Sequence, residues 1–338
     1  MKNPRPLVAL HEHLDGCVRI STMLDIAIKE QIKLPSQTRE GLFQALRCGE
    51  IRHSLGDYLS AFPITTSVMQ SQSALTRIAR EHVEDAARDG VKWLEPRFMP
   101  DLHTARGLSL DFVFGAVRDG LYYAGKQHGV GWGMIVCSMR HVHPDVTGRM
   151  IDLAIRYKNH GIVAVDLAGD DNLPAYEHAK HYLRAKENGL EVVIHAGESG
   201  PAIRVVEAVE KFGATRIGHG NKALIEPELV EYLFRHRVGV EACPTSNVQT
   251  KGVESYETHP ALNCLKYGSM VSINTDNRTL ADTTMVRELE LVRQHWNLDL
   301  MQVYHLILNA IYMSFAPKAV KQQLSADLFA DLEALSQP

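Results

Sequence analysis

The sequence has few cysteines, and their arrangement suggests neither disulfides nor a cysteine-based metal site. The five cysteines in 338 residues are odd in number and widely scattered, and none belongs to a Cys-x-x-Cys pair. This usage is typical of reduced thiols and argues against a framework of disulfide bonds. We therefore expect a protein of the cytoplasm.

Long apolar runs and an excess of one charge are also missing. No run approaches the length that a membrane-spanning helix needs, and the first residues lead directly into Leu7–Leu10 without the pattern of a signal peptide. Lys and Arg number 36 against 40 Asp and Glu, a formal charge of -4. Such a balance attracts neither a polyanion nor an anionic membrane surface, so we expect no nucleic-acid or membrane partner. Oligomeric state cannot be predicted from these features.

Several well-known catalytic signatures are absent. There is no phosphate-binding G-x-x-x-x-G-K-[ST], no dinucleotide-binding G-x-G-x-x-G and no G-x-S-x-G elbow. Asp15 occupies the place of the second histidine in the zinc-protease motif H-E-x-x-H, and no P-C-x-x-C follows an H-x-E. These absences exclude helical zinc-protease sites and zinc sites of the cytidine-deaminase type.

Short apolar runs instead alternate with amphipathic stretches along most of the chain, which indicates repeated βα units. The helical patterns include 74–88, 109–127, 174–188 and 201–212. Eight runs are candidate strands: 6–11, 91–98, 130–137, 161–167, 190–195, 215–218, 237–242 and 269–274. We predict an α/β fold, one TIM (β/α)8 barrel spanning residues 1–338. A helical lid insertion at about 35–70 follows the first strand, and extra helices occupy about 280–335.

Polar residues stand at the ends of most of these strands. In a (β/α)8 barrel the carboxyl ends of all strands share one face, where active sites lie. Residues far apart in sequence should therefore meet around one axis. The polar segments are His11-Glu12-His13, Gly169-Asp170-Asp171, His195-Ala196-Gly197-Glu198, Gly218-His219-Gly220, Cys243-Pro244-Thr245-Ser246 and Asn274-Thr275-Asp276-Asn277.

His11 and His13 are the first candidate metal ligands, because two residues apart on a strand their side chains point to the same face. With 17 histidines, about one His-x-His is expected by chance, and His141-Val142-His143 repeats the spacing. The additional presence of His195 and Asp276 at other strand ends distinguishes the first pair. Three imidazoles and a carboxylate favour zinc, with a water completing the site.

Structural explanations exist for the same residues when each is taken alone. Asp276 could cap the helix that follows it. Glu198 precedes the helix-start residues Ser199 and Pro201, so it could be an acid in the first turn of a helix. A single His219 at a strand end would more often be an ordinary polar residue. The metal interpretation depends on all the strand ends together.

Six motifs follow one another along the chain: His11-x-His13-Leu14-Asp15-Gly16, Asp166-Leu167-Ala168-Gly169-Asp170, His195-Ala196-Gly197-Glu198, Arg216-Ile217-Gly218-His219-Gly220, Cys243-Pro244-Thr245-Ser246-Asn247 and Ser272-Ile273-Asn274-Thr275-Asp276. In this order they resemble the motifs of the adenosine deaminase family, and the resemblance covers about residues 7–330. It implies one zinc ion per chain, held by His11, His13, His195 and Asp276, and a small purine nucleoside as substrate.

The resemblance also implies individual roles. Glu198 would protonate purine N1, His219 would orient the attacking hydroxide, and Asp276 would accept a hydrogen bond from it. Gly169 would donate its backbone N–H to purine N3. Asp15 would bind the ribose 5′-hydroxyl, and His13 also lies on the substrate side. An apolar gate over the purine would consist of Tyr58, Leu59 and Phe62.

Asn277 departs from the commonest family pattern, which has a second acid facing purine N7. An Asn amide can also donate to N7, so the change affects tolerance for related purines rather than the reaction itself. Adenine and aminodeoxyfutalosine deaminases more often carry Glu where this chain has Asp15, which favours adenosine or 2′-deoxyadenosine. Adenine, 5′-methylthioadenosine and aminodeoxyfutalosine remain alternative substrates. A catalytically inactive barrel or a two-metal amidohydrolase is a more distant alternative.

Overall fold

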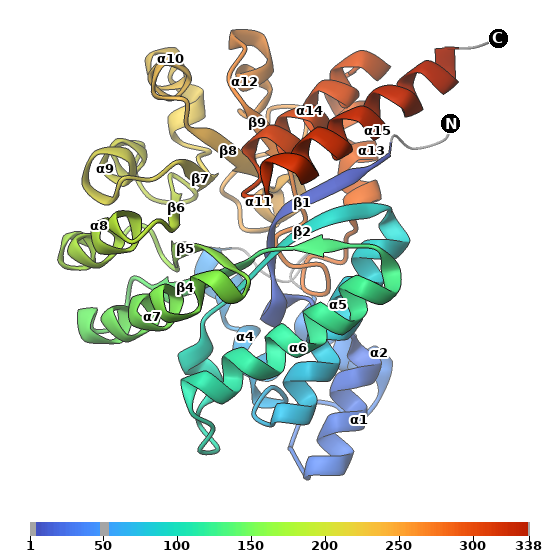
Figure 1. The fold of residues 1–338 in the computed structure, drawn as a ribbon, viewed down its shortest axis with the longest axis vertical. Coiled ribbons are helices and arrows are strands. Elements are labelled where there is room, and N and C mark those ends of the chain that lie inside the picture. Colours follow the sequence, from blue (N-terminus) through green and yellow to red (C-terminus); the bar gives the residue numbers. More distant parts are fainter. Residues whose placement is uncertain (1–4, 48–53, 337–338) are drawn as a thin grey trace.

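The computed structural model describes residues 5–47 and 54–336 and shows a parallel barrel surrounded by helices (Figure 1). Neighbouring strands pair in the order β1-β2-β4-β5-β6-β7-β8-β9, and β3 pairs with β2. The strands found in the described residues are β1 (Leu7–His13), β2 (Val91–Phe98), β3 (Gly131–Trp132), β4 (Met134–Met139), β5 (Ile162–Ala168), β6 (Glu191–Ala196), β7 (Arg216–His219), β8 (Gly239–Ala242) and β9 (Val271–Ile273). The predicted TIM (β/α)8 fold is confirmed.

The third predicted strand, 130–137, is divided at Gly133 into β3 and β4, and β4 continues to Met139. The Gly133 N–H donates to the carbonyl of Leu94 on β2 at 3.0 Å. A Cβ atom at Gly133 would lie 2.8 Å from the side chain of Val163 on β5. A larger residue at this close approach would push β4 and β5 apart.

The barrel closes where the end of β1 meets the segment after β9. Asp276 donates its backbone N–H to the carbonyl of His11 at 3.0 Å, and His13 donates to the carbonyl of Asp276 at 2.8 Å. The side-chain oxygen of Asn274 accepts the backbone N–H of Leu10 at 2.9 Å. Residues more than 260 positions apart are thereby joined at the carboxyl end of the barrel.

Helices cover the barrel, and several begin where the sequence supplies a capping side chain. Ser71 accepts a backbone N–H at the start of α5, and Asp299 with Gln302 forms a capping box at the start of α14. The helices are α1 (Ile20–Glu30), α2 (Arg39–Leu46), α3 (Leu55–Leu59), α4 (Phe62–Ser67), α5 (Gln72–Asp89), α6 (Leu110–His128), α7 (Pro144–Tyr157), α8 (Ala179–Glu187), α9 (Ile203–Phe212), α10 (Pro227–His236), α11 (Pro244–Gln249), α12 (Leu262–Tyr267), α13 (Met285–His295), α14 (Leu300–Met313) and α15 (Lys318–Ser336).

These bounds agree with the predicted helical stretches except near two starts. The stretch predicted from 174 opens with a 3-10 turn, Tyr176–His178, before α8 begins, and α9 begins two residues after Pro201. The predicted insertion at 35–70 contains α2, α3 and α4, while its residues 48–53 lie outside the described ones. The predicted C-terminal helices are α13, α14 and α15, and α14 packs against β9 and β1 (Figure 1).

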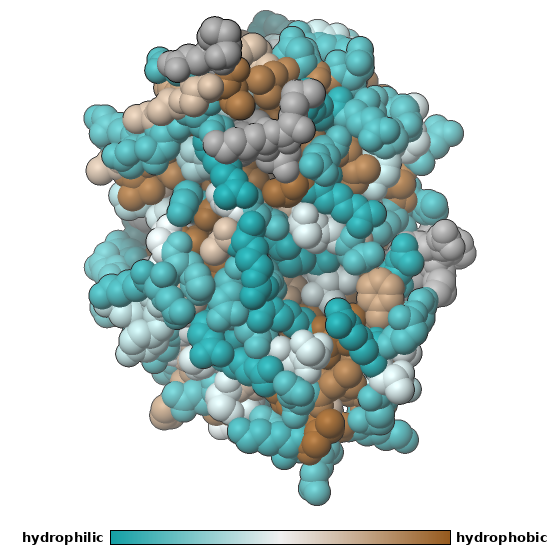
Figure 2. Space-filling model, turned by 90° about the vertical axis from the view of Figure 1, so that its right-hand side faces the viewer, coloured by the Kyte–Doolittle hydropathy of each residue, from teal (hydrophilic) through white to brown (hydrophobic). Residues whose placement is uncertain are grey.

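A large apolar cluster extends from Leu7 on β1 to Leu328 on α15, and a smaller one contains Ile135, Ala164 and Val193. The single domain stays a prediction. One face of the molecule is mostly hydrophilic, with hydrophobic side chains gathered in smaller patches near its two ends (Figure 2). None of the helices in the described ranges is both long enough and apolar enough to cross a lipid bilayer. The four described cysteines are buried and free.

Glu288 on α13 is a fully buried carboxyl whose ionisation should make stability depend on pH. It accepts hydrogen bonds from the Thr283 hydroxyl at 2.6 Å and the Thr245 backbone N–H at 3.1 Å, yet burial raises its pKa from 4.5 to about 7. Because the pKa is higher in the folded than in the unfolded state, ionisation of Glu288 lowers the free energy of unfolding. Its contribution therefore falls as pH rises from 4.5 to about 7 and is constant above.

We expect Glu288→Gln to remove this pH dependence. The free energy of unfolding of the wild type, measured relative to Glu288→Gln, should fall by about 2–3 kcal/mol between about pH 5 and pH 8. Chemical denaturation at the two pH values measures the difference, and any constant effect of the amide cancels. An unchanged difference between wild type and variant would show that Glu288 ionises normally.

Candidate active site

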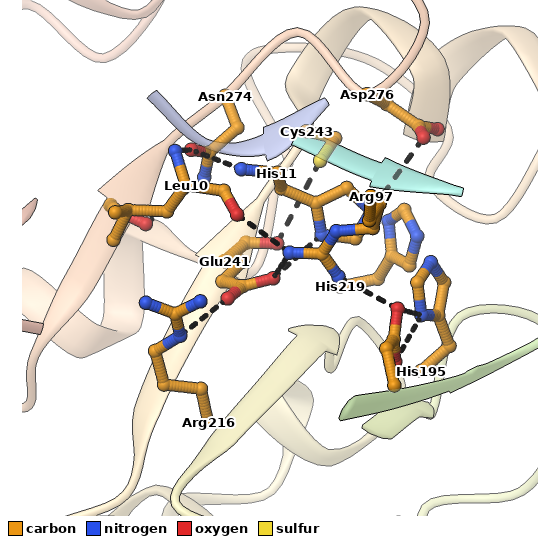
Figure 3. Close-up of polar contacts among 12 residues, drawn as sticks. Leu10, His11, Arg97, His195, Arg216, His219, Glu241, Cys243, Asn274 and Asp276 are labelled. Atoms are coloured by element: carbon orange, nitrogen blue, oxygen red, sulfur yellow. Dashed lines mark hydrogen bonds and ion pairs between the residues drawn. The ribbon is translucent and has the colours of Figure 1, made fainter. Parts of the chain in front are cut away.

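The four predicted metal ligands lie together at the carboxyl end of the barrel, and Figure 3 shows three of them, His11, His195 and Asp276. The Nε2 atoms of His13 and His195 are 3.2 Å apart. Oδ1 of Asp276 lies 3.6 Å from Nε2 of His11 and 3.5 Å from Nε2 of His13. All four residues are at most 6% exposed. Four ligand-type side chains from β1, β6 and the segment after β9 thus face one small space.

Carboxylates behind two of the imidazoles orient them toward this space. Nδ1 of His11 lies 2.8 Å from Oε2 of Glu241, and Nδ1 of His195 lies 3.0 Å from Asp166. A carboxylate that accepts from one ring nitrogen leaves the other available, as is usual for histidines that bind metals. Within the described part of the chain, Nε2 of His11 is buried and has no hydrogen-bond partner. Three imidazoles and a carboxylate with such an orphaned atom fit a zinc ion.

A buried ionic network below the site holds these carboxylates. Arg97 on β2 donates to Asp166 at 2.9 Å and to Glu241 at 2.7 Å, and it also donates to the carbonyl of Leu10 at 2.6 Å (Figure 3). Arg216 lies 2.6 Å from the other oxygen of Glu241. Burial opposes ionisation of both carboxyl groups. His195 and Arg97 nevertheless hold the pKa of Asp166 below its usual range, and Arg97 and Arg216 do the same for Glu241.

This network was not predicted from the sequence. Asp166 and Arg216 stand in the family motifs, which assign them no role. Arg97 and Glu241 belong to predicted strands. The available signal was a set of charged residues inside otherwise apolar strands, which is uncommon unless the charges are paired.

A pocket of about 310 Å³ opens beside the predicted ligands. The predicted site residues along its wall are His13, His195, Glu198, His219, Gly169, Asp276, Asn277, Tyr58, Leu59 and Phe62. Lining residues that sequence reasoning missed are Leu55, Pro63, Thr66, Leu102, Met139, His141 and Ala168.

The second His-x-His sequence is divided between two environments. Both residues are exposed, but His141 lines the pocket, whereas Nδ1 of His143 accepts the backbone N–H of Asp145 at the start of α7. The two rings therefore do not form a metal-binding pair. A His-x-His spacing alone is weak evidence for metal binding, so this agrees with expectation.

Asp15 does not lie among the residues that line the pocket. It is buried in the turn after β1, and burial raises its pKa to about 7. Its Oδ1 atom has no hydrogen-bond partner among the described residues. The structure therefore places Asp15 close behind His13 in sequence but not on the pocket wall.

Glu198 is the buried acid of the pocket. It is 4% exposed, and burial, reinforced by the negative charges of Asp276 and Asp171, raises its pKa well above the usual value. The Asp171 carboxylate fixes the loop by accepting the backbone N–H groups of Glu198 at 2.9 Å and Gly200 at 2.6 Å. Glu198 is thus held in place, in surroundings that favour its protonated form.

His219 faces Glu198, with 3.6 Å between its Nε2 and the Glu198 Oε2. Its Nδ1 lies 3.0 Å from the side-chain nitrogen of Asn247, whose oxygen in turn lies 3.2 Å from Nε2 of His259. Because an amide nitrogen only donates, Nδ1 of His219 accepts, and the ring proton is on Nε2. Burial and the neighbouring His11 lower the pKa of His219 well below its usual value, so the ring is neutral. Sequence reasoning gave Asn247 and His259 no role.

Comparisons with known proteins agree with this architecture. The family described as "Adenosine deaminase" matches residues 6–330. The adenosine deaminase of Clostridium botulinum strain Langeland is 38% identical over 322 residues, covering 95% of this chain and 96% of that protein. The structure of the adenine deaminase from Arthrobacter aurescens superposes with a TM-score of 0.91 at 26% identity, covering 98% and 100% of the two chains. The N6-methyl-AMP deaminase from Arabidopsis thaliana gives a TM-score of 0.84 at 25% identity and 96% coverage of each chain.

The match over almost the whole chain, together with the buried imidazole and carboxylate cluster at the carboxyl end of a (β/α)8 barrel, shows that this chain belongs to the adenosine deaminase family of hydrolytic deaminases.

Proposed function

We propose that the chain removes the 6-amino group of adenosine and 2′-deoxyadenosine by hydrolysis, forming inosine or deoxyinosine and ammonia. One zinc ion would be held by His11, His13, His195 and Asp276. The observation that carries the proposal is the buried Glu198, whose pKa burial raises well above its usual value, in one pocket with His13, His195 and Asp276. A zinc ion in this place supplies an activated water at neutral pH.

The reaction adds water at purine C6, which requires a proton on N1 as the ring loses its aromaticity. Glu198 is suited to donate that proton because its carboxyl group stays neutral in the buried pocket. His219 carries its proton on Nε2 and would orient the attacking oxygen from the side facing Glu198. Asp276, whose other oxygen accepts from Ser246 at 2.6 Å, would accept a hydrogen bond from the water. Of the two protons of the attacking water, one would replace the proton that Glu198 gives to N1 and the other would pass to the amino group. The C6–N bond then breaks, ammonia leaves and the oxygen stays on C6.

The pocket wall supports a neutral purine nucleoside as substrate. Tyr58, Leu59 and Phe62 on α3 and α4 would cover the base, with Gly169 and Asn277 as hydrogen-bond donors toward N3 and N7. Among the described residues that line the pocket there is no Lys or Arg to bind a phosphate. The nucleotide of the Arabidopsis enzyme, N6-methyl-AMP, is therefore less suited to this wall.

Free adenine is the second candidate substrate, because the structure of an adenine deaminase superposes closely on this chain. Asp15 favours a nucleoside instead. Asp15 does not line the pocket, so binding of the ribose would have to open a path to its buried Oδ1. This oxygen is an acceptor without a partner among the described residues, a state that costs free energy and that a 5′-hydroxyl would relieve. Two other 6-aminopurines, 5′-methylthioadenosine and aminodeoxyfutalosine, remain alternatives on the same reaction.

The proposal is tested by incubating the pure protein with adenosine, 2′-deoxyadenosine, adenine and 5′-methylthioadenosine. Ammonia release and the purine absorbance report turnover, and elemental analysis reports bound zinc. We expect turnover of the two nucleosides with a hydroxyl at the 5′ position and one zinc ion in this site. Absence of ammonia from every substrate, with zinc present, would reject the proposal.

Substitution of Asp15 should separate the two candidate substrates. We expect Asp15→Ala to lower kcat/KM for adenosine by about 10- to 100-fold, the worth of one hydrogen bond to a charged or strongly polar group, and to leave adenine turnover nearly unchanged. Exposed Asp145 provides the matched control, Asp145→Ala, which should alter neither substrate. Equal losses with adenosine and adenine would mean that Asp15 does not recognise the ribose.

A further inference from the structure

A second group of metal-ligand side chains lies on the outer side of β1. Side chains alternate along a strand, so His11 and His13 face the barrel interior whereas Glu12 between them faces outward. There it meets His82 on α5 and Cys17 in the turn before α1. The ligand atoms of the three residues lie within 4.8 Å of one another. None of these residues has a role in the proposed deamination.

This group is sealed from solvent and incompletely satisfied. Glu12 is 0%, His82 2% and Cys17 4% exposed. Oε2 of Glu12 and Nε2 of His82 are 3.3 Å apart, and neither atom has a hydrogen-bond partner among the described residues. Two orphaned polar atoms that face each other in a dry interior are unusual, because each carries a desolvation cost that no bond offsets.

The surrounding groups hold the three side chains as outer partners hold metal ligands. The Thr275 hydroxyl donates to Oε1 of Glu12 at 2.7 Å, which leaves Oε2 directed toward His82. The backbone N–H of Arg278 donates to Sγ of Cys17 at 3.4 Å, so the sulfur is placed as an acceptor. Both contacts come from the loop after β9. Such hydrogen bonds to ligating carboxylates and sulfurs orient them and support the charged forms that bind a metal.

A divalent cation would offset the charges of its own ligands. Arg278 forms an ion pair with Asp89 at 2.5 Å, and these two charges cancel. Burial and the neighbouring Glu12 raise the pKa of the Cys17 thiol well above its usual value, so its proton would leave only when a cation takes its place. One divalent ion would then match the two negative charges of the bound carboxylate and thiolate.

We propose that Glu12, Cys17 and His82 form a second, structural metal site that binds Zn²⁺. One sulfur, one imidazole nitrogen and one carboxylate oxygen form a ligand set that zinc accepts, with a fourth position for a water or a carbonyl. On binding, the S–H bond of Cys17 breaks, a bond from sulfur to the metal forms, and the proton leaves to solvent. The bound ion would join β1, α5 and the turn before α1 behind the catalytic face of the barrel.

Cobalt substitution tests this site independently of the deaminase proposal, because the four proposed catalytic ligands contain no sulfur. The full-length apoprotein is dialysed against Zn²⁺ or Co²⁺, and metal content is measured. We expect two ions per chain and, with Co²⁺, a near-ultraviolet charge-transfer band from sulfur to cobalt. Cys17→Ala should retain one ion per chain and lose the band. His82→Phe should also retain only one ion per chain. Cys264→Ala, which alters a buried free cysteine on α12, is the matched control and should behave as the wild type.

Two results would overturn the proposal. One is a single ion per chain in the wild type without the sulfur band. The other is a band that persists at full intensity in Cys17→Ala. Deaminase activity is recorded in parallel, so that loss of the catalytic ion and loss of the second ion are seen separately.

Discussion

Replacement of Glu198 by Gln should lower kcat by about 10²- to 10⁴-fold, the usual contribution of a well-placed general acid, while bound zinc is retained. The amide has nearly the same shape and fills the same buried position, but it cannot transfer a proton to purine N1. The structure supports this role because burial keeps the Glu198 carboxyl protonated. Steady-state kinetics with adenosine, together with elemental analysis of zinc, measure both parts of the prediction.

Glu228 on α10 offers a matched control, since it is exposed and does not line the pocket. Glu228→Gln should retain wild-type kcat and zinc. Turnover by Glu198→Gln within a few-fold of the wild type would remove Glu198 from the catalytic step. Loss of zinc together with activity would instead assign it a structural role at the metal site.

Arg97→Met should be among the most destabilising single changes in this protein. Arg97 is fully buried and donates to two carboxylates, Asp166 and Glu241, which each hold an imidazole of the metal cluster. Removing one partner from a buried ion pair leaves an uncompensated charge and costs about 3–5 kcal/mol. Here two carboxylates lose a partner, although Arg216 still faces Glu241. We expect a large fall in the free energy of unfolding and weaker zinc binding.

Chemical denaturation and zinc titration of the variant measure these two effects. Arg235→Met is the control, because Arg235 pairs with Glu231 on the exposed surface of α10, where ion pairs contribute about 1 kcal/mol or less. An Arg97→Met protein with wild-type stability and zinc affinity would show that Asp166 and Glu241 hold the histidines without it. Arg97→Lys should recover only part of the loss, because one ammonium group cannot reproduce the fork of a guanidinium.

The composition and pattern of the chain were enough to predict the barrel because the physical constraint is repetitive. Each buried parallel strand needs a short apolar run, and each returning helix needs one apolar face. The strand ends then had to share one face, so His11, His13, His195 and Asp276 could be expected together before any coordinates. The break at Gly133 could not be expected, since it arises from contact with Val163 on a strand 30 residues away in sequence.

The residues over the pocket could be predicted only through the family resemblance, because they do not belong to a strand. The resemblance predicts Tyr58, Leu59 and Phe62 there, and the structure places them along the pocket. The spacing of His141 and His143 treats the two residues alike. Only the path of the chain after β4 brings His141 to the pocket and His143 to the start of α7.

The sequence by itself determined the fold class and which polar residues share the carboxyl end of the barrel, because alternation along a strand and the direction of a parallel sheet are local properties. The tertiary structure alone decided which groups contact these polar side chains. Arg97 lies between Asp166 and Glu241, Asp15 lies behind the pocket wall, and Glu12 meets His82, because strands far apart in sequence become neighbours only when the barrel closes. Those pairings depend on distances across the barrel that no spacing along the chain contains.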